Sequence, residues 1–515
     1  MSADAPVITS GGDHEMTLRA PARARVRSWS GWVQAHALFI VAVAAVLILT
    51  LAGIPSHFAQ DGWLALVAGR EIASHGIPQH DYFTHMAFGV RWTDQQWLAQ
   101  LVMYLLQQLG GMQLLTVVYV FITGGAFAAA LVSARRLGAQ DLHVLAVLPL
   151  GAFFYLATAV SIRTQGFAYP LFIATLYLLA SDIRSEQRLR RTYLVVPILI
   201  LWANLHGSVT MGVGLVVLYA ASLTIARARQ LGLRHALSAR AVSLAVLAPL
   251  TLFATPYGTQ MVHYYSVTLM NPEFSRLVTE WKPVTSAPFL AVPLAAVLLG
   301  TLFTIARTWR RTPLFDQLVL LVLAVGAIDA VRNITWFGLA LLMLLPAAVS
   351  KLKGDRPAPL RRARINRVFA LAMISLTGLM TLVTLAQPTS WFTSAYPAKA
   401  IPTLDRLIAR DPSVRIFADV HYADWLIWQD PSLFSGRVAY DTSLELLTNR
   451  QLEAIATLTT HHRGGVPAVL RPYGVWVLNP VNKTGNRWLL SRPGVHTVLR
   501  TKTVIIATHA VGASA

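Results

Sequence analysis

Long uncharged apolar runs recur along the chain and are separated by short clusters of arginine and lysine. A helix rises about 1.5 Å per residue, so roughly 20 apolar residues are needed to cross the hydrocarbon core of a bilayer. The clearest runs of this kind are 37–54, 112–134, 288–306 and 368–387. The pattern therefore predicts a helical protein that crosses a membrane many times.

The basic clusters predict the orientation of these helices, because cytoplasmic loops of membrane proteins carry an excess of lysine and arginine. Four arginines precede the first run, so residues 1–36 are expected in the cytoplasm and the loop 55–96 outside. The later clusters mark cytoplasmic turns at Arg135–Arg136, 184–191, 227–240, 307–311 and 351–367. The hairpins between the clusters have outward tips near Ser161, His206, Asn271 and Arg332.

The stretch 97–110 decides how many crossings there are. It is short for a crossing and is followed by Gly111, so we expect it to lie at the membrane interface or to re-enter the membrane. About eleven helices then cross within residues 37–387, and residues 388–515 lie outside with the loop 55–96. If the stretch did cross, residues 388–515 would lie in the cytoplasm.

Residues 388–515 are more charged than the membrane region and contain short β-branched runs between helix-like stretches. The runs 414–417, 475–478 and 503–507 predict strands, and 449–458 predicts a helix. A linker is indicated by Pro388, Pro397 and Pro402. The expected architecture is a multi-span α-helical membrane domain followed by a small extracytoplasmic α/β domain.

The composition supports this architecture and excludes several classes of protein. Of the 515 residues, 55% are hydrophobic and only 13% are charged, a balance that soluble proteins of this size do not show. The net charge of +20 lies in the turns between apolar runs, with no basic face bearing interleaved aromatics, so nucleic acid is not an expected partner. The chain has no cysteine, which excludes disulfides and thiolate chemistry.

The loop 55–96 combines acidic and aromatic residues close to the predicted membrane surface. A carboxylate there could accept a proton from an acceptor hydroxyl, and a tryptophan face could stack on a sugar ring. Asp61 and Asp81 are the candidate acids, and Trp63 and Trp97 the candidate stacking residues. In the alternative interpretation, the tryptophans anchor helices at the interface and the acids only keep the loop solvated.

Four short motifs carry a resemblance to a known family; they are Asp61-Gly62-Trp63, 76–84, 97–100 and 202–207. They resemble the bacterial membrane glycosyltransferase-like proteins of the GT-C superfamily, which use polyprenyl-phosphate-linked sugars as donors. The resemblance implies a many-helix fold in which Asp61 serves as catalytic base or metal ligand and Asp81 supports it. Gly62 stands where the best-studied members carry a second acid, so a divalent metal ion remains an open alternative.

Two arginines lie at predicted outward tips, where basic residues are disfavoured. Their presence there suggests that each binds a specific partner. A lipid phosphate is a suitable partner, because a guanidinium matches phosphate oxygens in bidentate geometry. Arg163 has no partner nearby in the sequence, whereas Arg332 could instead pair with Asp329, one helical turn away.

Three further polar residues are candidates at the outward tips. His206 could bind donor or acceptor through its ring nitrogens, or it could be a structural histidine hydrogen-bonded near Asn204. Glu280, beside a tryptophan, could supply another catalytic carboxylate or could be a solvated loop acid.

These candidates favour an inverting membrane glycosyltransferase at the outer face of a bacterial inner membrane. It would move a sugar from a polyprenyl phosphate to a lipid or cell-envelope glycan, with Asp61 as base and Asp81 or Glu280 assisting. Arg163 and Arg332 would bind the phosphate, and Trp63, Trp97, Asn204 and His206 the substrates. The alternatives are a transporter that translocates lipid-linked glycans and a non-catalytic envelope scaffold.

Overall fold

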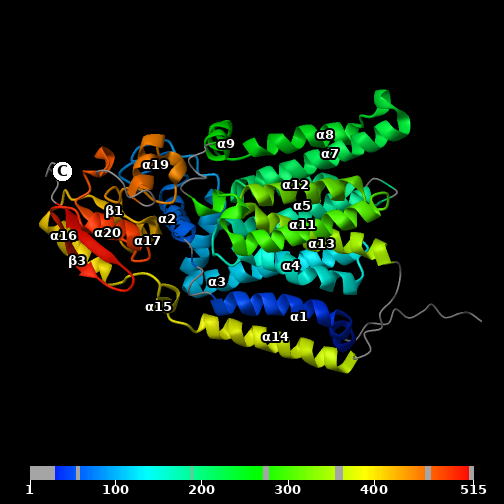
Figure 1. Ribbon diagram of the computed structural model, residues 1–515, viewed down its shortest axis with the longest axis horizontal. Coiled ribbons are helices and arrows are strands. Elements are labelled where there is room, and N and C mark those ends of the chain that lie inside the picture. The colour runs from blue at the N-terminus through cyan, green and yellow to red at the C-terminus, as the bar shows by residue number, and fades with distance from the viewer. Residues whose placement is uncertain are drawn as a thin grey trace, which may run out of the picture.

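The computed structural model describes residues 29–53, 58, 60–185, 187, 190–270, 278–353, 363–458 and 466–509. Most of the predicted cytoplasmic tail, the predicted tip at Asn271 and part of the basic cluster 351–367 lie outside these residues. The described chain forms a bundle of long helices with a smaller α/β part at one end (Figure 1).

Apolar helices make up the bundle, as the hydropathy pattern predicts. Among the described residues, eight helices are long and apolar enough to cross a membrane. They are α1 (Trp29–Gly53), α3 (Trp97–Arg136), α4 (Asp141–Ala159), α5 (Ala168–Ile183), α7 (Val209–Leu231), α11 (Pro288–Thr308), α13 (Ile334–Lys353) and α14 (Ala363–Leu385). Three shorter helices pack beside them; they are α6 (Val195–Leu205), α8 (Ala239–Leu250) and α12 (Leu314–Asp329). The prediction of a polytopic helical membrane protein is confirmed.

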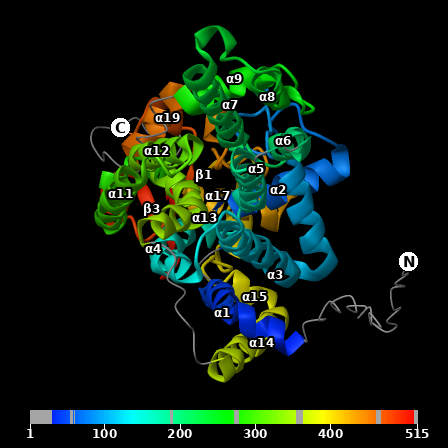
Figure 2. The ribbon, with the colours of Figure 1, turned by 90° about the vertical axis from the view of Figure 1, so that its right-hand side faces the viewer.

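The helices differ in how far they are buried. α13 is almost wholly buried and packs against α4 and α12, whereas α14 is mostly exposed and packs chiefly on α1 (Figure 2). Large apolar side chains of α14, such as Leu379 and Leu382, face outward. Such a surface fits contact with lipid chains better than contact with water.

The helices are ordered so that their basic turns lie at one end of the bundle. The turn between α7 and α8, which contains the cluster 227–240, lies at the end away from the α/β part (Figure 1). α1 and α14 also begin at this end and run toward the α/β part. The alternation of apolar runs and basic clusters in the sequence therefore corresponds to the two ends of the bundle.

The stretch 97–110 is helical, but it is separated by a kink from the span that follows. α3 contains both segments, and its geometry breaks at Gly110 (φ −155°, ψ 28°) and Gly111 (φ 68°, ψ −170°). Only glycine adopts the second conformation readily. The first segment packs against α2 (Gln60–His75), where the absence of a side chain at Gly69 lets the Gln100 backbone approach. The break separates the stretch 97–110 from the apolar segment that follows, and α3 as a whole is one of the eight candidate spans.

A four-stranded mixed sheet forms the centre of the α/β part. Its strands are β1 (Ile416–Ala418), β2 (Val475–Leu478), β3 (Val495–Arg500) and β4 (Ile505–His509). They are ordered β1-β2-β4-β3, with β1 parallel to β2 and the other pairs antiparallel. Three strands coincide closely with the predicted runs. The sequence did not predict β3, whose side chains are mostly exposed and so lack the apolar pattern of its neighbours.

Short helices surround the sheet and connect it to the bundle. They are α15 (Thr389–Phe392), α16 (Ala400–Arg410), α17 (Val420–Gln429), α18 (Pro431–Phe434), α19 (Asn449–Ala456) and α20 (Lys483–Leu490). The predicted linker is shorter than expected, because α16 already begins at Ala400 and contains Pro402 in its first turn, where proline is tolerated.

The loop between α2 and α3 is joined to the α/β part by backbone hydrogen bonds. The amide of His85 donates to the Val438 carbonyl (2.7 Å), and the amide of Met86 donates to the Ala439 carbonyl (2.9 Å). Val438 in turn forms a parallel bridge with Ile416 of β1. The loop thus extends the edge of the sheet.

Side-chain contacts join α2 to α17. The guanidinium of Arg70 donates to the Ile427 carbonyl (3.0 Å) and the Trp428 carbonyl (3.2 Å), and it lies 4.7 Å from the centre of the Trp428 ring. α2 therefore lies between the bundle and the α/β part (Figure 1). A residue at the start of α2 is consequently held by both parts of the molecule.

Candidate active site

Asp61 lies in the first turn of α2, where the helix dipole favours a negative charge. The chain before α5 passes close to this turn, since Phe58 and Ile162 form a parallel bridge. A Cβ atom on Gly62 would lie only 2.6 Å from the Ile162 carbonyl oxygen. Glycine at this position therefore permits the approach that places Arg163 beside Asp61.

Arg163 links two carboxylates from distant parts of the chain. Its Nη1 donates to Glu280 at 2.7 Å and 2.9 Å, and it lies 3.6 Å from Asp61 Oδ2. The Arg163 side chain is only 6% exposed, whereas the side chains of Asp61 and Glu280 are 46% and 41% exposed. Nε and Nη2 of Arg163 have no hydrogen-bond partner among the described residues. Two buried donors are thus left over beside two accessible acids.

The segment that carries Arg163 is held in place by the core. Tyr119 of α3 donates its hydroxyl to the Ser161 carbonyl (2.5 Å), and Thr164 is hydrogen-bonded to Gln96. Gly166 packs directly on the Tyr119 ring, where a Cβ would come within 2.3 Å. Arg163 is therefore presented from a fixed backbone.

Glu280 and Arg332 come from two adjacent short helices, η6 (Thr279–Trp281) and η8 (Val331–Asn333). The Val331 amide donates to the Lys282 carbonyl (3.0 Å), which joins the two segments. The Arg332 guanidinium lies 4.2 Å from the centre of the Trp281 ring. No ion pair between Arg332 and Asp329 occurs in the described chain, so the alternative pairing with Asp329 is not the one adopted.

The charges of this cluster shift each other's pKa. Burial raises the pKa of Asp61, Arg163 and Arg332 lower it, and Glu280 raises it. Burial alone would raise the pKa of Glu280, but the charge and hydrogen bonds of Arg163 lower it. Glu280 is therefore the carboxylate that stays ionised with Arg163, and Asp61 is the better proton acceptor.

His206 and Asn204 lie near the cluster but already have partners. Burial and the charges of Arg332 and Arg163 lower the pKa of His206 to about 3, so its ring is neutral at pH 7. Its Nδ1 is hydrogen-bonded to Ser208, not to Asn204. Asn204 accepts a hydrogen bond from Trp97 Nε1 (2.9 Å) and donates to two backbone carbonyls. Trp97 and Asn204 thus connect α3 to α6.

Trp63 is buried, although the sequence predicted an exposed side chain that could contact a substrate. Its side chain is 1% exposed and packs against Phe58, Tyr396 and Trp428, so no face is free to stack on a sugar. The prediction of a substrate contact at Trp63 is wrong, because α17 of the α/β part packs against α2 and buries this side chain.

Asp81 stabilises a turn of the loop between α2 and α3. Its carboxylate accepts hydrogen bonds from the Phe83 amide (2.9 Å) and from the Thr84 hydroxyl (2.6 Å), and its side chain is buried. This turn precedes the segment that pairs with Val438 and Ala439. In the described chain Asp81 forms no contact with Arg163, so its catalytic role as a supporting acid stays a prediction without a contact behind it.

The sequence did not single out three carboxylates of the α/β part that also approach this region. Asp424 lies on α17, Asp441 follows the segment 436–439, and Glu445 lies on η9 (Leu444–Leu446). The charge of Asp61 raises the pKa of both Asp424 and Glu445, after burial as the main cause. No spacing or motif in the sequence marks them, because they are brought to Asp61 only by the docking of the α/β part.

The described residues do not fit a metal centre at Asp61. No group of three or more histidine or acidic side chains within the described ranges is arranged to hold a metal ion. The position beside Asp61 that a cation would take is occupied by the Arg163 guanidinium. A mechanism through a divalent ion at Asp61 therefore has no support from the geometry.

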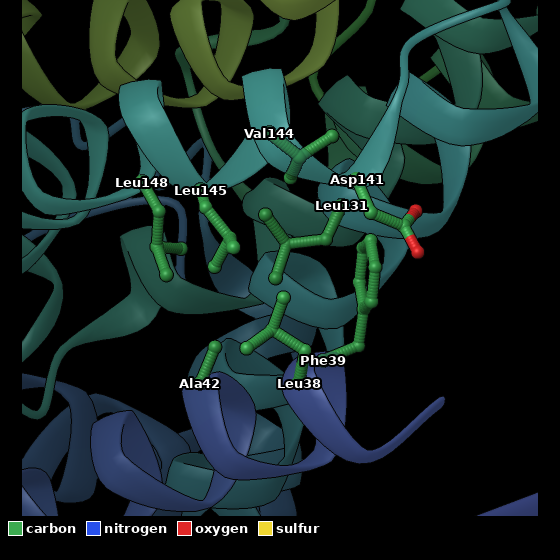
Figure 3. Close-up of a pocket in the computed structure, with 8 residues that line it drawn as sticks. All are labelled: Leu38, Phe39, Ala42, Leu131, Asp141, Val144, Leu145 and Leu148. Carbon is green, nitrogen blue, oxygen red and sulfur yellow. The ribbon is translucent and has the colours of Figure 1, made fainter. Parts of the chain in front are cut away.

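A small cavity elsewhere in the bundle offers no comparable chemistry. It lies between α1, α3 and α4 and is lined by apolar side chains and by Asp141 (Figure 3). The carboxylate of Asp141 is paired with Arg135 at 2.9 Å. The polar group at this cavity is thus already satisfied.

No protein-family model and no curated protein sequence matches the chain. Solved structures do match it. ArnT from Cupriavidus metallidurans in the apo state matches with a TM-score of 0.50 at 12% identity, over 94% of this chain and 98% of that one. The Archaeoglobus fulgidus oligosaccharyltransferase tethered to an acceptor peptide matches with a TM-score of 0.50 at 10% identity, over 87% of this chain and 70% of that one. The same ArnT bound to undecaprenyl phosphate matches with a TM-score of 0.48 at 15% identity, over 94% of this chain and 99% of that one.

The first two matches show the fold of the chain. The chain shares the overall fold of ArnT and of that oligosaccharyltransferase, and at the level of the fold this confirms the resemblance expected from the sequence. At these identities the likeness shows the fold alone, and a fold can host more than one function.

Proposed function

We propose that this protein is an inverting glycosyltransferase that moves a sugar from a polyprenyl phosphate to a lipid or cell-envelope glycan. The observation that carries this proposal is the cluster of Asp61, Arg163, Glu280 and Arg332, with accessible carboxylates around a buried arginine. It lies within a GT-C-like fold, at the end of the bundle that meets the α/β part.

Arg163 and Arg332 are suited to the donor phosphate. Arg163 is fixed by Glu280 through Nη1, and its Nε and Nη2 remain as hydrogen-bond donors for phosphate oxygens. Such preorganised donors stabilise the negative charge that develops on the phosphate as the bond between the sugar and the phosphate breaks. Glu280 then acts as the residue that positions Arg163 rather than as a second base.

Asp61 is suited to act as the general base. Its carboxylate would accept the proton of an acceptor hydroxyl while that oxygen attacks the anomeric carbon and the polyprenyl phosphate leaves from the opposite side. Burial raises its pKa above the ordinary value for aspartate, which strengthens it as a proton acceptor. Arg163, at 3.6 Å, keeps enough of the carboxylate ionised.

The reaction is assigned to the outer face of a bacterial inner membrane. The support is the excess of arginine and lysine in the turns at the other end of the bundle. A reporter fused after residue 387 should therefore be extracytoplasmic, and one inserted between Lys351 and Arg367 should be cytoplasmic. A cytoplasmic signal from the first fusion would overturn the assigned face and the count of eleven crossings, and the stretch 97–110 would then be the missing crossing.

The activity is tested by incubating purified protein with radiolabelled polyprenyl-phosphate sugars and membrane extracts that contain acceptors. We expect label to move into a lipid or glycan fraction with wild type and not with Asp61→Asn. Asp405→Asn, which changes an exposed acid of α16, is the matched control and should transfer normally. Equal transfer by wild type and Asp61→Asn would remove Asp61 from the mechanism.

A further inference from the structure

Two basic side chains meet where the end of α11 lies beside the end of α13. η8 joins α12 to α13 at the candidate active site, so the end of α13 and the turn between α11 and α12 lie at the opposite end of the bundle. Arg311 Nη1 donates to the Lys351 carbonyl (3.2 Å), and Lys351 Nζ donates to the Arg311 carbonyl (2.5 Å). Each side chain thus reaches across the backbone of the other residue, and two positive charges lie side by side.

No acid neutralises this pair of charges within the described residues. Asp316, on the neighbouring α12, is already paired with Arg184, whose Nη1 donates to its Oδ1 at 3.2 Å. Neither Arg311 nor Lys351 forms an ion pair with a carboxylate in the described chain. Like charges at close range repel each other, and a bound anion would offset that repulsion.

Two further arginines extend the positive charge. Arg307 lies in the last turn of α11, Arg310 follows that helix, and both are exposed. Neither has an ion pair or a side-chain hydrogen bond among the residues that the structure describes. At other basic turns an arginine is paired with an acid, as Arg135 is with Asp141. We call the following four residues the basic corner: Arg307, Arg310, Arg311 and Lys351.

A row of exposed apolar side chains on α11 leads into the basic corner. Val292, Leu299 and Phe303 are 72%, 71% and 63% exposed. Arg307 and Arg310 continue the row, because the residues recur at steps of seven, four, four and three, which keep to one face of a helix. α11 lies on the outside of the bundle, so this face is turned away from the other helices (Figure 2).

Trp309 stands where the apolar row gives way to the charges. Its side chain is 56% exposed and it directly follows α11. Tryptophan is enriched at the level of the lipid headgroups, and arginine side chains at the end of a lipid-facing helix extend toward those headgroups. The basic corner therefore lies at the height of the headgroups, with the apolar row in the hydrocarbon core.

We propose that the basic corner binds the headgroup of an anionic phospholipid, whose acyl chains lie along Leu299 and Phe303. Guanidinium and ammonium groups are strong hydrogen-bond donors to phosphate oxygens, and basic pockets between membrane helices bind anionic headgroups in this way. The apolar row favours a lipid over a soluble anion, because only a lipid covers both parts of the face. The charge favours an anionic headgroup over a zwitterionic one, whose cationic group would lie among four cations.

Binding of single lipids to the purified full chain in detergent, followed by native mass spectrometry, tests this site without any need for sugar transfer. The probes are phosphatidylglycerol and phosphatidylcholine with the same acyl chains, which differ in net charge. We expect the first phosphatidylglycerol to bind wild type at least about tenfold more tightly than the first phosphatidylcholine. Combining Arg307→Gln with Arg310→Gln should reduce this preference to about twofold.

This double variant changes exposed positions, so it does not put folding at risk. Combining Arg311→Gln with Lys351→Gln provides a second test and should weaken the preference in the same way. The matched control combines Arg229→Gln with Arg234→Gln, which removes two exposed charges at or beside the turn between α7 and α8, at the same end of the bundle. The control should keep the preference of wild type.

Three results would overturn the proposal. One is equal binding of the two lipids by wild type, and another is an equal loss of preference in the control, which would make the effect one of general surface charge. The third is binding of glycerophosphoglycerol, the headgroup without acyl chains, as tightly as the lipid, because the occupant would then be a soluble anion. None of these results depends on Asp61, so a negative transfer assay would leave the lipid site standing.

Discussion

The two ends of the bundle both contain buried charged side chains, but these differ in whether all their polar atoms have partners. At the end away from the α/β part, Asp182 is 0% exposed and accepts hydrogen bonds from Thr192 (3.0 Å), Tyr219 (2.5 Å) and Arg240 (2.9 Å). Both of its oxygens are satisfied. A nearby second pair, Arg184 with Asp316, is likewise closed and connects α5 to α12.

At the other end of the bundle, some polar atoms of the charged side chains lack partners. Arg163 has two buried nitrogens without partners among the described residues, and its carboxylate neighbours Asp61 and Glu280 are accessible to solvent. In ion pairs that serve only the fold, the polar atoms normally all have partners, because an unsatisfied buried group costs stability. This difference supports the proposal that Asp61, Arg163 and Glu280 bind a ligand, whereas the Asp182 network serves the fold.

The largest effect should follow from breaking the closed network. Asp182→Ala leaves Arg240 without its carboxylate and should lower the free energy of unfolding by about 3–5 kcal/mol. Denaturant unfolding in detergent micelles measures this, with Asp405→Ala as a control for loss of an exposed acid. A change below about 1 kcal/mol, the scale of an exposed ion pair, would show that the network is not structural.

The next effect concerns the open cluster. Asp61→Asn keeps the size of the side chain but removes the proton acceptor, so turnover should fall by roughly a hundredfold or more while donor binding survives. A transfer assay and a thermal melt, run beside Asp81→Asn, measure both properties. Unchanged turnover with a lowered melting temperature would instead make Asp61 a residue that only stabilises the start of α2.

Arg163 should show a smaller and graded effect. Arg163→Ala should weaken donor binding by roughly tenfold or more, and Arg163→Lys by less, since lysine keeps the charge but loses the planar fork. Titration with a fluorescent polyprenyl-phosphate analogue measures the affinities. Equal affinities for wild type and both variants would exclude Arg163 from the donor site, and Arg332→Lys provides the comparison on the other side of the cluster.

Gly62→Ala tests how the cluster is assembled. The added methyl would meet the Ile162 carbonyl oxygen at 2.6 Å and push Arg163 away from Asp61. We expect turnover to fall by several-fold, with a loss of stability of roughly 1–3 kcal/mol from overpacking. Gly214→Ala in α7 is the control, because nothing lies within 4 Å of the added atom. Wild-type kinetics in Gly62→Ala would show that the close approach is not needed.

The smallest expected effect is a shift in the pH profile. Asp61 is active only when deprotonated, so kcat/KM should fall as the pH drops through its pKa, which lies above the ordinary value because of burial. Arg163 lowers this pKa, and its removal in Arg163→Ala should therefore move the acid limb to higher pH. A limb that does not move, or that moves to lower pH, would mean that another group controls it.

Much of the fold could be predicted from local patterns. The strand run 475–478 coincides with β2, the helix 449–458 contains α19, and the break at Gly111 separates the stretch 97–110 from a span. β3 was missed because it is mostly exposed and carries no alternating pattern. Local sequence predicts an element only where burial produces a regular pattern of apolar residues or where a residue such as glycine constrains the backbone.

The candidate site was predictable as a set of residues but not as an arrangement. Arg163 and Arg332 stand out because basic residues at outward tips are disfavoured, and Asp61 and Glu280 stand out because each is an acid close to a tryptophan in a loop. That Glu280 pairs with Arg163, 117 residues away, could not be read from spacing. The burial of Trp63 was likewise hidden, since it depends on α17 covering α2.

The many apolar spans and the polar residues at the ends of the helices could be read directly from the chain, because hydropathy and charge act locally. Which of these residues contact each other depends on how the helices and the α/β part pack together. The close approach at Gly62 places Arg163 beside Asp61, and the docking of the α/β part brings Asp424 and Glu445 toward the same acid. Contacts between distant segments arise from packing, and packing is a property of the whole fold.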